Sequence, residues 1–513
     1  MSQRVHYDYS SRQRRIIWVV IFVLAAVVAT GLFIYFSRTG EIVISADPAQ
    51  AQIKFGDEAA TGELAKNDLA PGRYEVEVSR AGFEPISEVI EIKRGQKIQR
   101  QIILAPQNFE FSLASTPKKA NYKLVLPDGS ERVGQTPFRE VVRAGEIKIE
   151  LSADGFQTLS ETYFLDQNRD LNLWLDKPGQ LLHLLWQVPS GASPKGAAFT
   201  PNGEEIWVSL LMGKKAGANV FRAADGEKLQ SINLEDNGGV EVIFNRAGDR
   251  AYVSQMETDT VYEIDVATRE ILRSFATKST WCKILELSPD EQTLYVTNWS
   301  GNNISEIDLA SGQVKRLIPT VGTPRSVYVT RDSQYLYIAG FDKGELQRIK
   351  TEDLSSEILY KSGGALRHIV ADEEKQILYI SDMAEAAIFR YHLDTGEMER
   401  WVKTDSNPNT IVLSPDKKVL FVSCRGTNAD ESYYVPGPDW GSVLVFDTAS
   451  GEMLDAIVGG NQPTALALSA DGTKLVSSNF LDGTLDLYAV PDYETLKQGN
   501  GGRSKAYKAE LKK

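Results

Sequence analysis

Residues 287–298 read Leu-Ser-Pro-Asp-Glu-Gln-Thr-Leu-Tyr-Val-Thr-Asn: the end of an apolar strand, a turn with Pro and Asp, and a second strand. Degenerate copies of this phrase recur seven times, with spacings of 45, 43, 42, 42, 42 and 55 residues. The aligned apolar residues are Phe199, Phe244, Leu287, Val329, Ala371, Leu413 and Leu468. A period of about 40–45 residues with four short strands per unit is typical of propeller blades. The repeat therefore predicts a seven-bladed β-propeller over residues 181–490.

The two ends of this repeat region are complementary. Residues 181–188 read as an outer strand that lacks the three strands before it, whereas the seventh unit has no outer strand after residue 490. We expect the first segment to complete the seventh blade, because this pairing leaves no long sheet edge open.

The phrases Tyr-Val-Thr-Asn and Ser-Pro-Asp resemble those of the YVTN family of seven-bladed propellers, over residues 181–490. The resemblance implies the fold. It does not imply one function, because such propellers host lactonases, quinoprotein-like subunits and binding modules.

An uncharged, mostly apolar run of 21 residues, 16–36, precedes these repeats. As a helix it would be about 30 Å long, enough to cross a bilayer once. Four arginines stand before the run and one follows two residues after it: Arg4, Arg12, Arg14, Arg15 and Arg38. This asymmetry predicts a cytoplasmic segment 1–15, a transmembrane helix 16–36 and an exported remainder, with the bacterial inner membrane as the expected location. The alternative is a signal peptide cleaved near residues 27–29, but the apolar run is longer than a signal sequence needs.

A duplication with an offset of 73 residues lies between the helix and the repeats. Residues 71–78 (Pro-Gly-Arg-Tyr-Glu-Val-Glu-Val) match residues 144–151 (Ala-Gly-Glu-Ile-Lys-Ile-Glu-Leu), and each copy is followed by Gly-Phe. The alternation of apolar and charged residues predicts strands with one buried face, and so two small β-sandwiches at 41–105 and 106–176. The pair resembles tandem PEGA domains, a module of bacterial and archaeal cell envelopes.

Charge limits the choice of partner. The net charge of −13 argues against a nucleic-acid partner, because phosphate neutralisation needs a basic surface. Residues 491–513 are locally basic, and we expect a solvated tail there.

No catalytic or cofactor-binding pattern emerges from the sequence. The four histidines lack ligand spacing, and there is no Gly-x-Ser-x-Gly elbow, no Gly-rich phosphate loop and no Cys-x-x-Cys-His site. We therefore predict no catalytic residue, no metal and no cofactor, and interpret the chain as a non-enzyme.

A set of cations occupies one position of the repeat, four residues before the aligned apolar residue. Four of the seven units have Lys or Arg there: Lys195, Lys283, Arg325 and Arg367. In a propeller this position begins the innermost strand, at the mouth of the central channel. The ring of charge would attract an anionic group. Alternatively, each cation pairs with a carboxylate of a neighbouring blade.

A second set of positions, directly after the second strand of each unit, is mostly apolar: Leu211, Met256, Trp299, Phe341, Met383, Arg425 and Phe480. The sixth unit also carries an insertion with Tyr433, Tyr434 and Trp440. Aromatic loops on a rigid scaffold are typical of recognition surfaces. We predict that Trp299, Phe341, Phe480, Tyr433, Tyr434 and Trp440 surround the cations. The alternative is that each apolar side chain only covers its own blade.

These patterns favour a single-pass, extracytoplasmic binding or scaffold protein of the cell envelope, whose propeller loops bind a protein, a peptide or an anionic glycan. Two alternatives stay open. One is an exported propeller enzyme, such as a lactonase or a quinoprotein-like dehydrogenase subunit, and the other is a structural subunit of an envelope machine.

Overall fold

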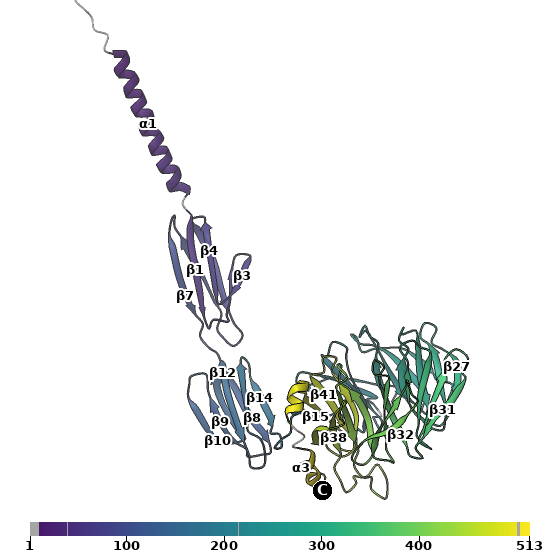
Figure 1. The fold of residues 1–513 in the computed structure, drawn as a ribbon. Helices are drawn as coiled ribbons and strands as arrows, with labels where there is room; N and C mark the ends of the chain where they lie inside the picture. The colour runs from purple at the N-terminus through teal and green to yellow at the C-terminus, as the bar shows by residue number, and fades with distance from the viewer. Residues whose placement is uncertain (1–9, 38, 214, 500–502) are drawn as a thin grey trace, which may run out of the picture. The chain divides into compact units, whose positions relative to one another are not determined.

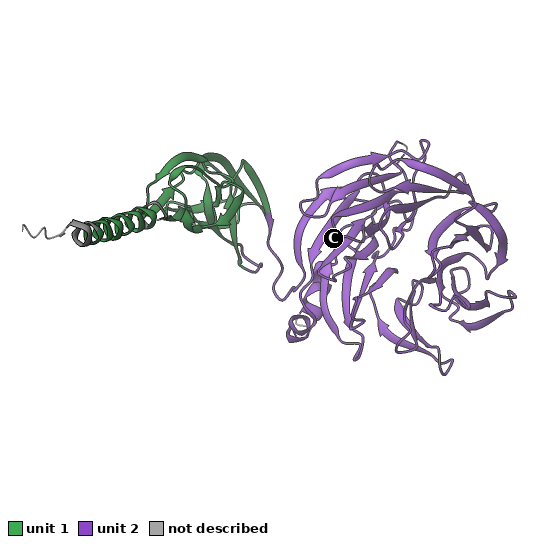
Figure 2. Ribbon diagram, turned by 90° about the horizontal axis from the view of Figure 1, so that it is seen from above, with its two compact units in different colours: residues 1–152, 158–172 green, residues 153–157, 173–513 purple. Residues whose placement is uncertain are grey.

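The computed structural model describes residues 10–37, 39–213, 215–499 and 503–513. Over these residues the protein is mostly β-structure, with one long helix near the N-terminus (Figure 1). Two compact units are present. One comprises the chain up to residue 152 together with 158–172, and the other comprises 153–157 and 173–513 (Figure 2). The prediction of an all-β protein with an N-terminal apolar helix is confirmed.

Helix α1 spans Ser10–Ser37. Its segment Arg15–Phe33 has a mean hydropathy of 2.8, and no part of this segment is buried. At about 1.5 Å per residue the segment is about 28 Å long. By length and composition it can cross a membrane, and a signal sequence near an N-terminus has the same properties. Residues 1–9 of the predicted cytoplasmic segment lie outside the described residues.

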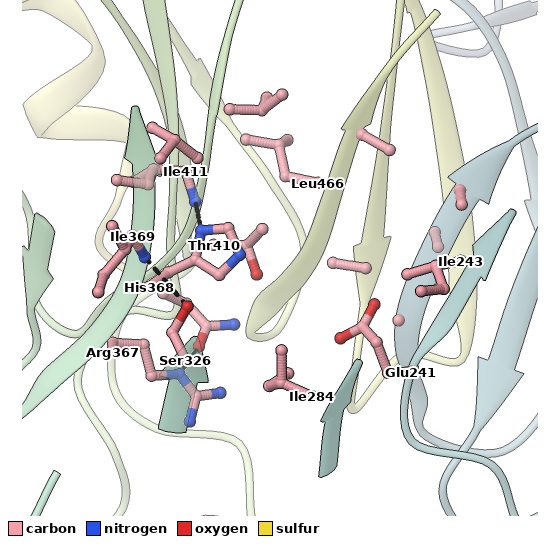
Figure 3. A pocket seen from close by; sticks show the side chains of 18 of the residues that line it. Glu241, Ile243, Ile284, Ser326, Arg367, His368, Ile369, Thr410, Ile411 and Leu466 are labelled. Carbon is pink, nitrogen blue, oxygen red and sulfur yellow. Dashed lines mark hydrogen bonds between the residues drawn. The ribbon is translucent and has the colours of Figure 1, made fainter. Parts of the chain in front are cut away.

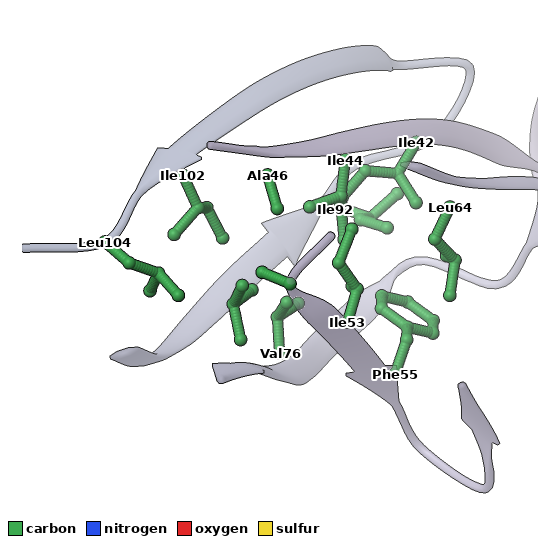
Figure 4. Packing of buried hydrophobic residues seen from close by; sticks show 12 residues of the cluster. Ile42, Ile44, Ala46, Ile53, Phe55, Leu64, Val76, Ile92, Ile102 and Leu104 are labelled. Atoms are coloured by element: carbon green, nitrogen blue, oxygen red, sulfur yellow. The ribbon is translucent and has the colours of Figure 1, made fainter. Parts of the chain in front are cut away.

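Two lobes follow the helix, each built from a three-stranded and a four-stranded sheet. In the first lobe the sheets are β4-β1-β7 and β3-β2-β5-β6. Its strands are β1 (Gly40–Asp47), β2 (Gln52–Phe55), β3 (Glu58–Thr61), β4 (Glu63–Leu69), β5 (Gly72–Ser79), β6 (Ile86–Ile92) and β7 (Lys97–Ile103). Alternate residues of β1 are buried, as the pattern of apolar and polar residues predicts. Ile42 and Ile44 of β1 meet Ile53 and Val76 of the other sheet in one core (Figure 4).

The second lobe repeats this strand order seven strands later, with sheets β11-β8-β14 and β10-β9-β12-β13. Its strands are β8 (Asn108–Thr116), β9 (Asn121–Val125), β10 (Glu131–Gln135), β11 (Phe138–Arg143), β12 (Gly145–Ser152), β13 (Leu159–Leu165) and β14 (Arg169–Trp174). The sequence duplication thus corresponds to a duplicated topology.

The remaining described strands form seven four-stranded antiparallel sheets. Six sheets use strands consecutive in the chain. The first three are β16 (Pro194–Phe199), β17 (Glu205–Leu210), β18 (Ala218–Arg222) and β19 (Lys228–Ile232); β20 (Val242–Phe244), β21 (Arg250–Gln255), β22 (Thr260–Asp265) and β23 (Ile271–Ala276); and β24 (Cys282–Leu287), β25 (Thr293–Asn298), β26 (Asn303–Asp308) and β27 (Gln313–Pro319). The next three are β28 (Pro324–Val329), β29 (Tyr335–Gly340), β30 (Glu345–Lys350) and β31 (Ser356–Lys361); β32 (Leu366–Asp372), β33 (Ile377–Asp382), β34 (Ala387–His392) and β35 (Met398–Lys403); and β36 (Pro408–Leu413), β37 (Val419–Cys424), β38 (Ser442–Asp447) and β39 (Met453–Val458).

The seventh sheet joins the two ends of this region. It contains β40 (Pro463–Leu468), β41 (Lys474–Asn479), β42 (Thr484–Ala489) and, beside β42, the much earlier strand β15 (His183–Pro189). The first strand of each sheet contacts the first strand of the next, and β40 contacts β16, so the seven sheets close a ring (Figure 2). Buried Asp455 reinforces the join, because its Oδ2 accepts the backbone N–H groups of Leu181 and Leu182, each at 2.9 Å.

The C-terminal residues contain two helices, α2 (Tyr493–Gln498) and α3 (Arg503–Glu510). The prediction of a solvated basic tail is wrong for α3, whose Arg503 and Tyr507 are buried. Arg503 makes two 2.6 Å bonds to the Glu510 carboxylate, and Tyr507 packs into the core of the sixth sheet. Pairing by Glu510 makes the burial of this guanidinium tolerable.

Candidate functional site

A local irregularity positions the predicted cations. In six of the seven inner strands the ladder to the second strand shifts register directly after the first residue: β16, β24, β28, β32, β36 and β40. The second residue of each, including Lys195 and Arg325, lies in this bulge. A bulged residue leaves the regular pleat and its side chain is re-aimed.

The turn into five of the seven inner strands is also strained. The residue before the strand has a left-handed backbone in five cases: Ser193, Trp281, Thr323, Asn407 and Gln462, with φ between 48° and 60°. In all five its carbonyl accepts a bond from the residue that follows the second strand, for example from Trp299 at 2.9 Å and from Phe341 at 3.0 Å. This bond ties the predicted aromatic positions to the beginnings of the strands that carry the cations.

The Thr of the repeated phrase has a structural task at this bulge. Thr297 Oγ1 accepts the backbone N–H of Ile284 at 3.0 Å, which the bulge removes from the ladder. A hydroxyl takes the same part at three other bulges, in the pairs Ser209 with Gly196, Ser423 with Thr410 and Ser478 with Ala465. Ser254 Oγ likewise accepts the N–H of Glu241, just before β20, where the ladder has no register shift. A buried N–H without a partner is costly, so the hydroxyl stabilises the bulge.

The structure brings the four predicted cations together and adds a fifth, Arg425. Burial lowers the pKa of Lys195 far below its usual range, and the charges of Arg367, Arg425, Arg325 and Lys283 lower it further. The other four cations therefore each lie within electrostatic range of Lys195.

Few polar groups of the protein satisfy these cations. Arg367 Nε donates to Asn409 Oδ1, and Arg425 Nη2 donates to Gln462 Oε1. Arg325 is only 5% exposed, and its Nε and Nη1 have no hydrogen-bond partner. Among the described ion pairs, none includes any of the five cations, so pairing with neighbouring carboxylates does not explain them.

A central cavity of about 510 Å³ lies among the inner strands, and Lys195, Arg325 and Arg367 line it. Glu241 also lines it, on the wall facing Arg367 (Figure 3). Burial raises the pKa of Glu241 to about 7, although Arg325 and Lys195 oppose this shift. Burial likewise raises the pKa of Glu286 to about 8. The carboxyl groups of this cavity thus gain protons near neutral pH and cancel little of the positive charge.

His368 lines the same cavity and is neutral at physiological pH. Burial lowers its pKa to about 4, and the neighbouring guanidinium groups of Arg325 and Arg367 act in the same direction. Its Nδ1 accepts the backbone N–H of Ile411 at 3.5 Å (Figure 3).

Aromatic rings adjoin the cations in two groups. In the first, the Lys283 ammonium lies 3.8 Å from the centre of the Trp299 ring, and Trp299 lies 5.0 Å from Phe341. Arg325 also approaches Trp299, at 6.0 Å. A buried cation over an aromatic face gains about 2 kcal/mol, so these rings help to hold the charges in place.

The second aromatic group surrounds Phe480. Lys195 lies 5.0 Å from its ring centre, and the rings of Tyr433 and Tyr434 lie at 6.4 and 6.1 Å. Arg425 approaches Tyr433 at 5.5 Å. Phe480 itself is buried, whereas both tyrosines are exposed.

Trp440 has a different environment from the other predicted aromatic residues. Its backbone N–H donates to the Leu511 carbonyl at 2.8 Å, and the Lys513 ammonium lies 4.6 Å from its ring centre. Trp440 therefore holds the insertion loop to the C-terminal residues.

Sequence reasoning missed two members of the cluster, Arg425 and Glu241. Arg425 is the one charged residue among the seven mostly apolar positions, and that exception was the available signal. No sequence signal pointed to Glu241, because the other units of the repeat have no acidic residue at this position. In the described part of the chain, no group of three or more His, Cys, Asp or Glu could hold a metal ion.

Comparison with known proteins identifies one module and one fold. The model of the PEGA domain family matches residues 39–108. Antigen Lp49 of Leptospira interrogans is 32% identical over 194 residues, which cover 36% of this chain and 41% of the antigen. The match thus spans less than half of that relative.

A solved structure, the hydrazine synthase of Kuenenia stuttgartiensis, matches 60% of this chain and 97% of its own chain with a TM-score of 0.51. At 16% identity this likeness shows the fold alone. The PEGA domain and the N-terminal apolar helix indicate an extracellular or membrane-associated protein.

Proposed function

We propose that the protein is a membrane-anchored, extracytoplasmic binding or scaffold protein of the cell envelope. Helix α1 acts as an uncleaved anchor with the N-terminus in the cytoplasm, in keeping with the arginine asymmetry around it. The second lobe acts as a further PEGA-like sandwich, because it repeats the topology of the matched first lobe. The ring of seven sheets is a YVTN-like propeller that carries the binding site.

One observation carries this proposal. Five cations without carboxylate partners and two aromatic groups converge at the beginnings of the inner strands. Unpaired buried charge is costly to the folded protein, so its retention points to a ligand that supplies the opposite charge. Exposed Tyr433 and Tyr434 beside this cluster offer contacts to a larger partner, such as a protein, a peptide or an anionic glycan.

Photo-cross-linking in native membranes tests this function. A photoreactive amino acid at Tyr434 should capture one discrete envelope component, because that side chain is exposed beside the cluster. The same amino acid at Val133, an exposed position of the second lobe, serves as the control. Identical captures from both positions would show that the loop face is not the binding surface.

A further inference from the structure

We propose that the central cavity is a built site for one doubly charged oxyanion, a phosphate or sulfate group carried by a small ligand or by a substituent of a larger one. This inference rests on the proposed function, since it specifies what enters the same site. The group that is recognised is one phosphate or sulfate inside the cavity, whereas a polyanion would bind along an exposed surface.

The charge count favours an anion with more than one negative charge. Lys195, Lys283, Arg325, Arg367 and Arg425 form no ion pair among the described residues, and Glu241 is the carboxylate whose charge acts on Arg325 and Arg367. Arg325, Arg367 and Arg425 alone carry three positive charges, so a singly charged ligand would leave most of the charge uncompensated even where the buried lysines lose their protons. A dianion compensates more of it and offers more acceptor oxygens.

The donors of the cavity fit an oxyanion. Arg325 lines the cavity and is only 5% exposed. Its Nε and Nη1 have no hydrogen-bond partner. Arg425, which is not among the residues that line the cavity, also keeps its Nε without a hydrogen-bond partner. A guanidinium presents donors in a planar fork that suits the oxygens of phosphate or sulfate, which an isolated chloride cannot match.

The burial of the arginines excludes the backbone of a polymer from the site, but a single phosphate or sulfate group at the end of a ligand can enter. Arg325, Arg367 and Arg425 are each at most 8% exposed, so a chain lying across the surface could not reach all three. The cavity volume of about 510 Å³ holds an oxyanion together with a small carrier. Ile243, Ile284 and Leu466 line the cavity and supply an apolar contact for that carrier (Figure 3).

Calorimetric titration of the full-length protein in detergent tests the site. Sodium sulfate and inorganic phosphate should bind saturably at constant ionic strength, whereas acetate should bind about tenfold more weakly or not at all. Phenyl phosphate should bind more tightly than inorganic phosphate, and Ile284→Ala, at an apolar position of the cavity wall, should reduce that advantage alone. Equal binding of acetate and sulfate, or no saturable binding of either, overturns the proposal.

Variants locate the binding. Arg325→Met should abolish sulfate binding, while Arg331→Met, an exposed arginine just beyond the other end of strand β28, should leave it unchanged. Should Arg325→Met fail to fold, Lys195→Met, at a residue that also lines the cavity, takes its place and should weaken sulfate binding about tenfold. Sulfate binding that survives in the folded variant assigns the ion to another site and contradicts the proposal.

The two proposals fail separately. Sulfate titration needs no macromolecular partner, so its failure leaves the cross-linked partner at Tyr434 in place. Conversely, if sulfate binds saturably but no partner is cross-linked, the oxyanion site stands and the proposal of a macromolecular partner is wrong.

Discussion

The ammonium of Lys283 is held among charges of its own sign. Burial lowers its pKa to about 6, and Arg325 and Arg367 contribute to the shift. In the central cavity, burial raises the pKa of Glu241 to about 7. At neutral pH the empty site thus exchanges protons at both groups, and a bound anion favours the charged lysine and the neutral glutamic acid.

This coupling predicts a pH dependence of sulfate binding. A bound anion raises both pKa values, so binding takes up protons and the affinity should fall as the pH rises from 6 to 8. Sulfate keeps its own charge over this range, and His368, with a pKa of about 4, stays neutral. Calorimetry at three pH values measures the effect. Glu241→Gln should flatten the upper part of the profile, and an affinity that rises with pH would contradict the coupling.

The hydroxyl of Thr297 gives a second test at this scale. Thr297→Val keeps the shape but leaves the Ile284 N–H of the bulge unsatisfied, so the free energy of unfolding should fall by about 1–3 kcal/mol. Thr297→Ser keeps the acceptor and should lose less than half as much. Urea unfolding compares the two, and equal losses would show that the methyl group matters and the hydrogen bond does not.

At the scale of elements, helix α3 anchors the last part of the chain. Tyr507 is fully buried in the core of the sixth sheet, and the residues after the helix pair with the insertion loop between β37 and β38. Lys512 Nζ lies 2.8 Å from the Asp439 carboxylate. The tail thus supports the loop that carries Tyr433 and Tyr434.

Tyr507→Ala should lower the free energy of unfolding by about 3 kcal/mol, because it leaves a large cavity. Tyr507→Phe, which retains the ring, should cost about 1 kcal/mol or less. The alanine variant should also make residues 428–440 more sensitive to limited proteolysis. If the loop stays as resistant as in the parent while stability falls, the tail does not hold the loop.

The elements were far more predictable than the tail and the fifth cation. Turns such as Ser288 to Thr293 are local, since Ser288 Oγ donates to Asp290 and accepts the Thr293 N–H, so their sequence marks each hairpin. Equivalent positions of the repeat are related by the rotation of the ring. The alignment of the repeats was therefore enough to predict that Lys195 and Arg325 lie close together. Arg503 and Arg425, by contrast, are buried beside distant partners, the Ala456 carbonyl and the Gln462 side chain, which no local pattern encodes.

In the whole molecule, closure of the ring depends on β15, a strand from the beginning of the repeat region that completes the last sheet. β15 pairs with β42 along its whole length, and Gln187 donates to Asp486, 299 residues later. Without β15 the edge of β42 would be open to other chains.

Replacing residues 183–189 by a flexible linker of the same length should lower the melting temperature and cause concentration-dependent association. Leu185→Ser, at a 38% exposed position of the same strand, should do neither. Differential scanning calorimetry and light scattering measure both effects. A linker variant that melts like the parent and stays monodisperse would show that the ring closes without this strand.

The late pairing of β15 also sets the order of events during biosynthesis. At about 5–20 residues per second, the 299 residues between Gln187 and Asp486 take roughly 15–60 s to synthesise. Throughout that interval β15 has emerged without its partner, and the growing row of sheets ends in an unfinished edge. Closure of the ring is thus a late step that joins residues far apart in the sequence. The ring should therefore depend on a holding chaperone for longer than the two lobes, whose strands pair with partners nearer in the sequence.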